Sequence, residues 1–371
     1  MATANERHVS NGRKPAGRKP SKQQREARKK RKVIIFGLEI ALLLVMLVVL
    51  WTVLKGTEVK RVEVNDEELE EKMNETVLEN ETLKGYRNVA LFGVDSTSGA
   101  LEKGTRSDTI IIASINQDTG DVKLVSVYRD TYLNRGNDKY GKCNAAYANG
   151  GPKQAMMMLN MNMDLNITDF VTVGFQGLTD AIDALGGVWI DVDSEELLHI
   201  NNYQMCIAEN LKCSYTEVKE TGYQLLNGLQ ATAYCRIRYT KGDDFMRAQR
   251  QREVIMAIAD QAKKANVSSL TKIANDVFPE IYTSLKLDEI VSLLMDVANY
   301  NIVAEDGFPR EDMRATGNIG GDGSCVVPLS LESNVVWLHE FLFDETGYEP
   351  SAEAKAYSQK VYSDTNKYLN K

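Results

Sequence analysis

The stretch 88–128, NVALFGVDSTSGALEKGTRSDTIIIASINQDTGDVKLVSVY, decides the fold class of this chain. It holds three short runs of β-branched and apolar residues, at 88–94, 109–115 and 122–128, which is the composition expected of strands. The second and third runs are joined by NQDTG, whose polar residues and glycine are typical of a hairpin loop. The sequence therefore predicts three strands that follow one another closely along the chain.

Beyond this stretch, helical and extended patterns alternate. Helices are predicted at 151–163, 176–185, 243–264, 268–281, 287–299 and 332–343. Strands are predicted at 170–173 and 188–192, with further short strands between 313 and 329. Strands that alternate with helices in this way indicate an α/β fold built in layers.

The composition is that of a globular protein with a packed core. Of 371 residues, 43% are hydrophobic and 26% are charged, values that exclude a disordered or collagen-like chain. The charge is distributed unevenly, because residues 1–32 carry 12 basic and 2 acidic residues and the remainder carries 32 basic and 50 acidic ones. The chain has only three histidines, which argues against a His-rich zinc site and against a Ser-His-Asp triad.

Residues 33–54, VIIFGLEIALLLVMLVVLWTVL, form a long apolar stretch with one charge, Glu39. At about 1.5 Å per residue a helix of this length spans the roughly 30 Å hydrocarbon core of a bilayer, so we expect one transmembrane helix. A cleaved signal peptide is the alternative, but residues 51–55 contain no small-residue cleavage site, which favours an uncleaved signal anchor. The five basic residues at 28–32 place the N-terminus in the cytoplasm and the rest of the chain outside.

On this basis the chain divides into five segments. They are a basic cytoplasmic arm (1–32), a transmembrane signal anchor (33–54), an acidic stalk or short juxtamembrane helix (55–86), an extracytoplasmic domain (87–347) and a polar, loose C-terminal tail (348–371). A basic arm beside a membrane span favours contact with membrane lipid, and no nucleic-acid partner is expected. The predicted localisation is the cell membrane, with a single pass.

Charged residues gather where the predicted strands end. Asp95 follows the first strand and Arg129 follows the third. Arg106 and Asp108 precede the second strand. Because ligands commonly bind at strand ends in open α/β sheets, these four residues are candidates for a binding site.

Two further groups join this set. In the segment YCRIR, a period of two puts Arg236 and Arg238 on one face if the segment is extended, whereas a helix would separate them. On the long helix predicted after it, Asp244, Arg247 and Gln251 are three and four residues apart and share one stripe. Several guanidinium groups are thus candidates for one shared binding site.

Arginines on an otherwise net-negative domain indicate a phosphate or pyrophosphate ligand, because the planar guanidinium binds such groups bidentately and keeps its charge. Asp95 and Asp108 could then hold Mg²⁺, which takes one or two carboxylates and leaves its other positions to water and phosphate oxygens. These parts suit phosphoryl transfer. The alternative is that the same residues form ordinary surface ion pairs.

Seven short motifs follow one another within residues 87–263: GVDS, RSDT, LVSVYRDT, GKCNAAYANGG, LGGVWIDV, LNGLQATAYCRIR and GDDFMRAQRQR. Their order and spacing behind one membrane anchor resemble the LytR-CpsA-Psr family. The resemblance implies an extracytoplasmic three-layer α/β/α sandwich with a central mixed sheet. It also implies a Mg²⁺-dependent phosphotransferase that moves a glycopolymer, such as teichoic acid or capsular polysaccharide, from an undecaprenyl-pyrophosphate carrier to peptidoglycan, with formation of a phosphodiester bond.

The resemblance also assigns roles to the candidate residues. Asp95 and Asp108 correspond to carboxylates associated with Mg²⁺. The residues that surround the pyrophosphate are Arg106, Arg129, Arg236, Arg238, Arg247 and Gln251. Catalysis is assigned to Arg129, Arg236, Arg238 and Asp244, where Asp244 either orients the arginines or helps to deprotonate the acceptor. Lys142 and Asn144 either line the site or hold a loop in place.

Two residues depart from the family pattern, and the cysteines leave pairings open. Tyr128 stands where the family commonly has proline. Cys143 stands where isoleucine is common, and it could pair with Cys235. Cys206 and Cys213 could close a small disulfide loop outside the cell.

Three functions stay open on the sequence, and the transferase leads. A hydrolase that cleaves the lipid pyrophosphate with water would use the same residues. A non-catalytic membrane-bound envelope regulator or transcriptional attenuator would not need the full set of arginines and aspartates. Residues 1–32 also show no helix-turn-helix pattern, which such a regulator would use on DNA.

Overall fold

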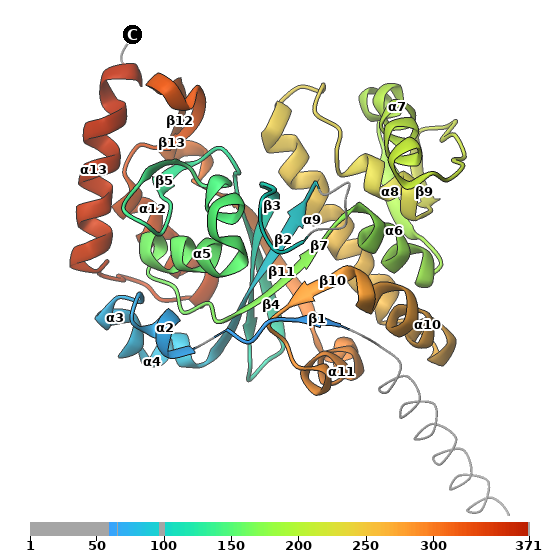
Figure 1. Ribbon diagram of the computed structural model, residues 1–371, viewed down its shortest axis with the longest axis horizontal. Helices are drawn as coiled ribbons and strands as arrows, with labels where there is room; N and C mark the ends of the chain where they lie inside the picture. Colours follow the sequence, from blue (N-terminus) through green and yellow to red (C-terminus); the bar gives the residue numbers. More distant parts are fainter. Residues whose placement is uncertain (1–58, 65, 96–100, 370–371) are drawn as a thin grey trace, which may run out of the picture. The chain divides into compact units, whose positions relative to one another are not determined.

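The computed structural model describes residues 59–369, apart from residues 65 and 96–100 (Figure 1). The predicted arm (1–32) and the predicted anchor (33–54) lie outside the described residues. Within the described part, no helix is both long and apolar enough to cross a membrane.

A seven-stranded mixed sheet runs through the middle of the fold (Figure 1). Its strands, in spatial order, are β1 (Lys60–Arg61), β10 (Ile281–Thr283), β7 (Asp169–Val173), β2 (Tyr86–Val94), β3 (Ser107–Asn116), β4 (Asp121–Val127) and β11 (Asn301–Phe308). The three strands predicted within 88–128 are β2, β3 and β4, and they pair antiparallel, so the predicted hairpin is confirmed. β7 lies parallel to β2 and β11 lies parallel to β4, which makes the sheet mixed.

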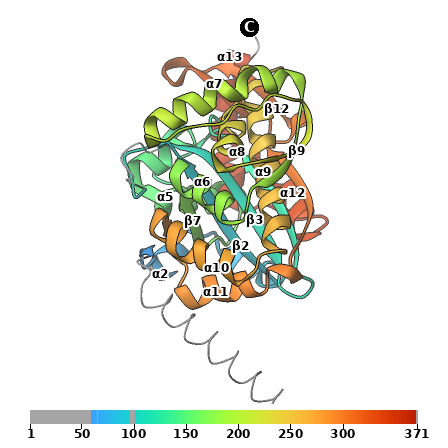
Figure 2. The same cartoon turned by 90° about the vertical axis from the view of Figure 1, so that its right-hand side faces the viewer.

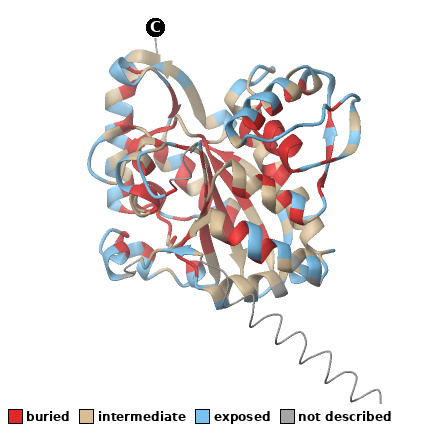
Figure 3. Ribbon diagram, turned by 45° about the vertical axis from the view of Figure 1, so that its right-hand side comes forward, coloured by how far each residue is buried: buried red, intermediate tan, exposed pale blue. Residues whose placement is uncertain are grey.

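The central strands of this sheet are buried on both faces (Figure 3). Along β3, Ile110 and Ile112 pack into a core with helix α5 (Ala145–Met163), whereas Ile111 packs on the other side with Ile255 of helix α9 (Asp243–Ala262). Successive strand residues point to opposite faces of a sheet. The uninterrupted apolar run in β3 is therefore the pattern of a strand that helices cover on both sides.

The helices on one side of the sheet are α5, α12 (Leu331–Phe343) and α13 (Ala352–Leu369) (Figure 1). Helix α5 is kinked at Gly150 and Gly151. At Gly151 φ is +69°, and a Cβ would lie 2.5 Å from the carbonyl oxygen of Glu102, so the position requires glycine. The helix predicted from residue 151 is the part of α5 that follows this kink.

The other side of the fold is built from helices and a two-stranded antiparallel sheet (Figures 1 and 2). In chain order these elements are α6 (Phe175–Ala184), β8 (Val188–Val192), α7 (Ser194–Leu211), β9 (Gly222–Leu226), α8 (Gly228–Tyr234) and α9. They share a hydrophobic core of their own, which includes Ile190, Ile200 and Tyr234. The predictions of α6, β8 and α9 are confirmed, whereas α7, β9 and α8 have no counterpart among the predicted elements.

The remaining elements are short. They are the helices α10 (Val267–Lys272) and α11 (Leu287–Met295), a π-helical turn (Ile273–Val277), the hairpins β5–β6 (Tyr132–Asn134, Tyr140–Lys142) and β12–β13 (Arg314–Asn318, Ser324–Pro328), and 3-10 turns at Phe278–Glu280, Val297–Asn299, Glu311–Met313 and Gly320–Asp322. Strands β10 and β11 are also absent from the predicted elements. β10 is only three residues long, and β11 carries two acidic residues that mask its apolar pattern.

Of the predicted stalk (55–86), the described residues 59–64 and 66–86 are part of the folded domain rather than a separate segment. They form the short helices α2 (Asp66–Glu70), α3 (Glu75–Leu78) and α4 (Glu81–Lys84) before the chain enters β2. Leu69, Val77 and Leu83 are buried in the main core. The prediction was wrong because these three apolar residues are too irregularly spaced to show a helical period.

Of the predicted loose tail (348–371), the described residues 348–369 are also part of the fold. They include helix α13, whose buried residues Ala354, Ser358, Val361 and Thr365 recur at spacings of four, three and four. This stripe packs against the elements around β5, β12 and α12. The prediction was wrong because two of the four buried residues are polar, so the composition hides the buried face.

All five cysteines lie in the described part of the chain, and all are free thiols. Cys206 and Cys213 are exposed but unpaired, so the predicted loop-closing disulfide is absent. Cys143 belongs to the main core and Cys235 to the core of α7 and α8, so their proposed pairing is contradicted as well. The Cys143 thiol instead lies 3.2 Å from the carbonyl oxygen of Tyr128.

We expect the Val361→Asp variant to lose about 3 kcal/mol or more in free energy of unfolding, because it buries an unpaired carboxylate in the core under α13. Urea unfolding at pH 7 measures this loss. The matched control is Tyr362→Asp on the adjacent, exposed position, which should change stability by about 0.5 kcal/mol or less. Equal stability of both variants would mean that α13 is not packed on the domain.

Candidate active site

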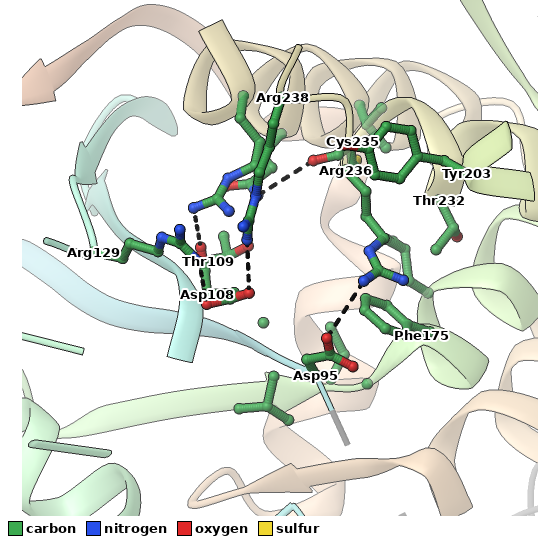
Figure 4. Close-up of a pocket in the computed structure, with 18 of the residues that line it drawn as sticks. Asp95, Asp108, Thr109, Arg129, Phe175, Tyr203, Thr232, Cys235, Arg236 and Arg238 are labelled. Carbon is green, nitrogen blue, oxygen red and sulfur yellow. Dashed lines mark hydrogen bonds and ion pairs between the residues drawn. The ribbon is translucent and has the colours of Figure 1, made fainter. Parts of the chain in front are cut away.

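A cavity of about 780 Å³ opens between the sheet and helices α6 to α9 (Figure 4). Its apolar part is lined by residues of β2, β7, α6 and α9, which include Leu91, Val171, Leu178, Val254 and Ile255. Its charged part is lined by Asp95, Asp108, Arg129, Arg236, Arg238 and Arg247. One cavity therefore joins an apolar compartment to a cluster of guanidinium and carboxylate groups.

The neighbouring ends of β2 and β3 carry the two predicted metal-binding carboxylates, Asp95 and Asp108. Gly93 pairs with Thr109 and the next residue of β2 pairs with Ser107, so Asp108 is an extra residue in β3, a β-bulge. A bulge bends a strand and redirects its side chain. A Cβ at Gly93 would lie 2.8 Å from the Thr109 side chain, so glycine is what permits this close pairing.

Asp108 lies among three arginines (Figure 4). Its Oδ1 accepts a hydrogen bond from Arg129 Nη1 at 2.8 Å, and its Oδ2 accepts one from Arg238 Nη2 at 3.2 Å. Its backbone carbonyl accepts a third from Arg247 Nη2 at 3.1 Å. Burial by itself would raise the pKa of the Asp108 carboxyl, but the charges of Arg129, Arg247 and Arg238 outweigh it, and the pKa is lowered.

Asp244, in the first turn of α9, meets the same arginines. Its Oδ2 accepts a hydrogen bond from Arg129 Nε at 3.1 Å. Its Oδ1 lies 3.5 Å from Arg247 Nη1 and 3.8 Å from Arg238 Nε. A carboxylate that pairs with three guanidinium groups is well placed to orient them.

Arg247 is the most deeply buried charged group of the site, with 5% of its side chain exposed. Burial, together with the nearby positive charge of Arg129, lowers the pKa of Arg247 to about 10. Its Nε–H group has no acceptor among the described residues. One donor of this buried guanidinium is therefore unsatisfied although Asp244 pairs with another, and an anionic ligand would supply the missing acceptor.

Arg236 occupies a separate position in the cavity. Its Nη2 lies 3.4 Å from Asp95 Oδ2, and its guanidinium lies over the ring of Phe175 at 4.2 Å from the ring centre (Figure 4). Such a contact with the face of an aromatic ring stabilises a cation. Asp95 is more exposed than Asp108, with 41% of its side chain accessible.

The predicted stripe on α9 is confirmed, because Asp244 contacts the arginines and both Arg247 and Gln251 line the cavity. Gln251 also donates a hydrogen bond to the carbonyl oxygen of Cys235 at 3.5 Å. Arg106 differs from the other predicted site residues, because it is exposed and does not line the cavity.

The segment YCRIR is not an extended strand. Tyr234 ends α8, and the N–H group of Arg236 still donates to the carbonyl oxygen of Ala233 at 3.0 Å, as in a helical turn. The chain then leaves the helix, and Ile237 is buried in the core beneath it. Arg236 and Arg238 nevertheless both line the cavity, because the chain turns between them.

Lys142 and Asn144 hold the loop after β4 and do not line the cavity. Lys142 Nζ lies 3.2 Å from Asp130 Oδ1, and the backbone N–H of Asn144 donates to the carbonyl oxygen of Arg129 at 3.1 Å. Of the two expectations for these residues, the loop-holding one agrees with the structure.

Tyr128, which replaces the family's usual proline, packs edge to face on Phe245 with ring centres 4.7 Å apart. Tyr128 precedes Arg129 and Phe245 follows Asp244 along the chain. The ring pair therefore packs the end of β4 against the start of α9, where Arg129 donates a hydrogen bond to Asp244.

Helix α7 supplies a wall of the cavity that sequence reasoning misses. His199, Asn202, Tyr203 and Cys206 line the cavity at helical spacings of three and four residues. The spacing is visible in the sequence once a helix is assumed. Their mixed polarity, however, forms neither an apolar stripe nor a catalytic motif.

Comparison with known proteins relates the chain to one family. The LytR_cpsA_psr family model matches residues 50–324. The chain is 32% identical over 213 residues to the polyisoprenyl-teichoic acid–peptidoglycan teichoic acid transferase TagU of Enterococcus faecalis, covering 56% of this chain and 65% of TagU. It is 28% identical over 308 residues to biofilm regulatory protein A of Streptococcus mutans, covering 73% of this chain and 72% of that protein.

A solved structure of the same kind shares the fold. It is that of the LytR-CPS2A-psr family protein YwtF (TagT) with bound octaprenyl pyrophosphate lipid, with a TM-score of 0.52 and 21% sequence identity. The likeness covers 77% of this chain and 96% of the other. It confirms a mixed α/β fold around a central mixed sheet.

The lowered pKa of Asp108 predicts that the stability of the folded state depends on pH. Its ionised form stabilises the folded state above the pKa of the unfolded chain, about 4, and this contribution is lost as the pH falls through the lower folded-state pKa. The Asp108→Asn variant should therefore be less stable than the wild type at pH 7, and the difference should shrink below about pH 4.

Urea unfolding at a series of pH values from 7 to 3 measures this difference. Asp118→Asn, at an exposed position in the β3–β4 turn, is the control and should match the wild type throughout. A difference for Asp108→Asn that stays constant across the whole pH range would contradict the assigned ion pairs.

Proposed function

Because this chain belongs to the LytR_cpsA_psr family, we propose that it is a phosphotransferase that moves a glycopolymer from a polyprenyl-pyrophosphate carrier to peptidoglycan. The glycopolymer would be of the teichoic acid or capsular polysaccharide type. The aligned relative TagU is named as a transferase of teichoic acid to peptidoglycan, which supports this reading. The alignment spans 65% of TagU, so substrate and acceptor form part of the proposal.

The observation that carries the proposal is the composition of the cavity of about 780 Å³. An apolar compartment formed by residues such as Val171 and Ile255 leads to Arg129, Arg238 and Arg247. This arrangement fits an amphiphile that has an apolar tail and a pyrophosphate head. The related YwtF (TagT) structure, with its bound octaprenyl pyrophosphate, is consistent with such a ligand.

In the proposed reaction, a hydroxyl oxygen of the acceptor attacks the phosphorus that carries the glycopolymer. The bond between this phosphorus and the bridging oxygen breaks, and polyprenyl phosphate leaves with the bonding electrons. The hydroxyl proton passes to water, and Asp244 orients Arg129, Arg238 and Arg247. Arg129, Arg236, Arg238 and Arg247 bind the pyrophosphate and stabilise the charge that grows on the leaving phosphate.

The carboxylates of Asp95 and Asp108 fit a Mg²⁺ ion in donor type, because both are hard oxygen donors at one cavity. Among the described residues, no group of three or more His, Cys, Asp or Glu side chains could hold a metal. Two carboxylates are sufficient for Mg²⁺ when water and phosphate oxygens complete its coordination. A bound Mg²⁺ would neutralise part of the pyrophosphate charge.

We also propose that residues 33–54 anchor the protein in the cell membrane with the domain outside. The largely apolar stretch of 22 residues and the basic residues at 28–32 support this topology. An extracytoplasmic domain would meet both a lipid-linked substrate and the peptidoglycan acceptor.

The Arg236→Ala/Arg238→Ala variant should lose about 100-fold or more in turnover, because two donors to the pyrophosphate are removed. The assay uses the full-length protein in detergent with a polyprenyl-pyrophosphate-linked saccharide, a peptidoglycan fragment and Mg²⁺. Mass spectrometry detects polyprenyl phosphate and the acceptor that carries the new phosphodiester. Arg310→Ala, at an arginine outside the cavity, serves as the control.

The products separate the possible functions. A wild-type protein that releases polyprenyl phosphate and labels the acceptor is a transferase. Release with the saccharide phosphate left free, and no labelled acceptor, would replace the transferase with a hydrolase. A folded wild-type protein that shows neither binding nor turnover would favour a regulatory role, as in the name of the Streptococcus mutans relative.

Cysteine labelling of intact cells tests the topology. Cys206 and Cys213 are exposed free thiols, whereas the other three cysteines are buried. If the domain is outside, a membrane-impermeant maleimide should label the wild type in intact cells and should not label the Cys206→Ser/Cys213→Ser variant. Labelling of the wild type only after cell lysis would contradict the proposed topology.

A further inference from the structure

Two arginines of the site have no regular secondary structure to hold them. Arg236 and Arg238 lie in the connection between α8 and α9. Connecting segments are generally more mobile than helices and strands. A guanidinium that must meet a phosphate within hydrogen-bond distance needs a fixed backbone, because a displacement of about 1 Å can reduce a rate by about 100-fold.

The guanidinium of Arg250, on α9, supplies such a fixed point. Its Nη1 donates a hydrogen bond to the carbonyl oxygen of Ile237 at 3.2 Å, and its Nη2 donates to Thr240 Oγ1 at 2.8 Å. Ile237 is the residue between the two site arginines. Arg250 itself is 2% exposed and does not line the cavity, so it does not reach the ligand.

The third nitrogen of this guanidinium joins the loop to helix α7. Arg250 Nε donates to Glu196 Oε1 at 2.7 Å. The other oxygen of Glu196 accepts from the backbone N–H of Asp193 at 2.9 Å, as part of the capping box that starts α7. One buried ion pair therefore connects the arginine-bearing loop, helix α9 and the helix that forms a wall of the cavity.

Arg252 provides an internal comparison. It lies two residues further along α9, is also buried, and also pairs with a glutamate, Glu305 of β11. Its ion-pair partner lies in the sheet, away from the loop that carries the site arginines. Glu305 is more exposed than Glu196, and the difference that matters for the site is that Arg250 binds the loop backbone whereas Arg252 does not.

We infer that Arg250 is a positioning residue, which holds the backbone at Ile237 so that Arg236 and Arg238 face the pyrophosphate. The inference rests on the proposed function, because it assigns Arg250 a role only if these two arginines bind the lipid pyrophosphate. A lysine at position 250 would keep a positive charge near Glu196. It could not place planar donors on Ile237 and Thr240 at the same time.

The test compares Arg250→Lys with Arg252→Lys in the full-length protein in detergent. The dissociation constant for geranylgeranyl pyrophosphate, a short polyprenyl pyrophosphate, is measured by titration calorimetry, and stability is measured by urea unfolding. Arg250→Lys should weaken binding by about tenfold to 100-fold. Arg252→Lys should change binding by about twofold or less, although both variants should lose stability.

Both substitutions are then repeated in the Arg236→Ala/Arg238→Ala background. There, Arg250→Lys should have no further effect on binding, because the groups that it positions are gone. The inference is overturned if Arg250→Lys binds like Arg252→Lys, or if its effect is the same in both backgrounds. If Arg250→Lys does not fold, Thr240→Val replaces it, because it removes one loop contact of the same guanidinium and should show the same dependence on background.

The same measurements separate this inference from the proposed function. If the wild type does not bind geranylgeranyl pyrophosphate, or if Arg236→Ala/Arg238→Ala binds it as well as the wild type does, the proposed function fails. If those two arginines matter and Arg250→Lys shows no background-dependent effect, only the positioning role fails.

Discussion

The carboxylate of Asp108 is the contact on which the arrangement of the site depends. Arg129, Arg238 and Arg247 would repel one another in a partly buried cavity, where their charges are weakly screened. Asp108 and Asp244 lie between them and hold three guanidinium groups within one small volume. The bulge in β3 determines this geometry, because it redirects Asp108 at the point where β2 ends.

Helix α9 links this charged cluster to the rest of the structure. Its first turns carry Asp244 and Arg247, while Ile255 packs on β3 and Val254 belongs to the core shared with α7 and α8. The cavity lies where these two cores meet, so one helix contributes both the apolar wall and the charged end. A ligand with a tail and a pyrophosphate head would contact both parts of the same rigid element.

The segments on either side of the predicted domain pack on its core, although their sequences show no apolar periodicity. Residues 55–86 and the tail after residue 347 look polar, yet the described residues of both segments bury part of their surface against the core. Asn74 of the first segment donates hydrogen bonds to Asp164 and to Ser351 Oγ of the second, so the two segments are joined through buried polar contacts. Pattern analysis detects apolar periodicity, and contacts of this kind have none.

The sequence by itself determined the α/β class, the β2–β4 order, the stripe on α9 and nearly all of the charged residues at the cavity. These features are local, because strand and helix periods and short motifs are read from neighbouring residues. Only the tertiary structure decided that Arg106 lies apart, that YCRIR is a turn, that α7 forms a wall and that Arg250 holds the arginine-bearing loop. Each of these depends on residues distant in sequence that approach one another, and no local pattern specifies such contacts.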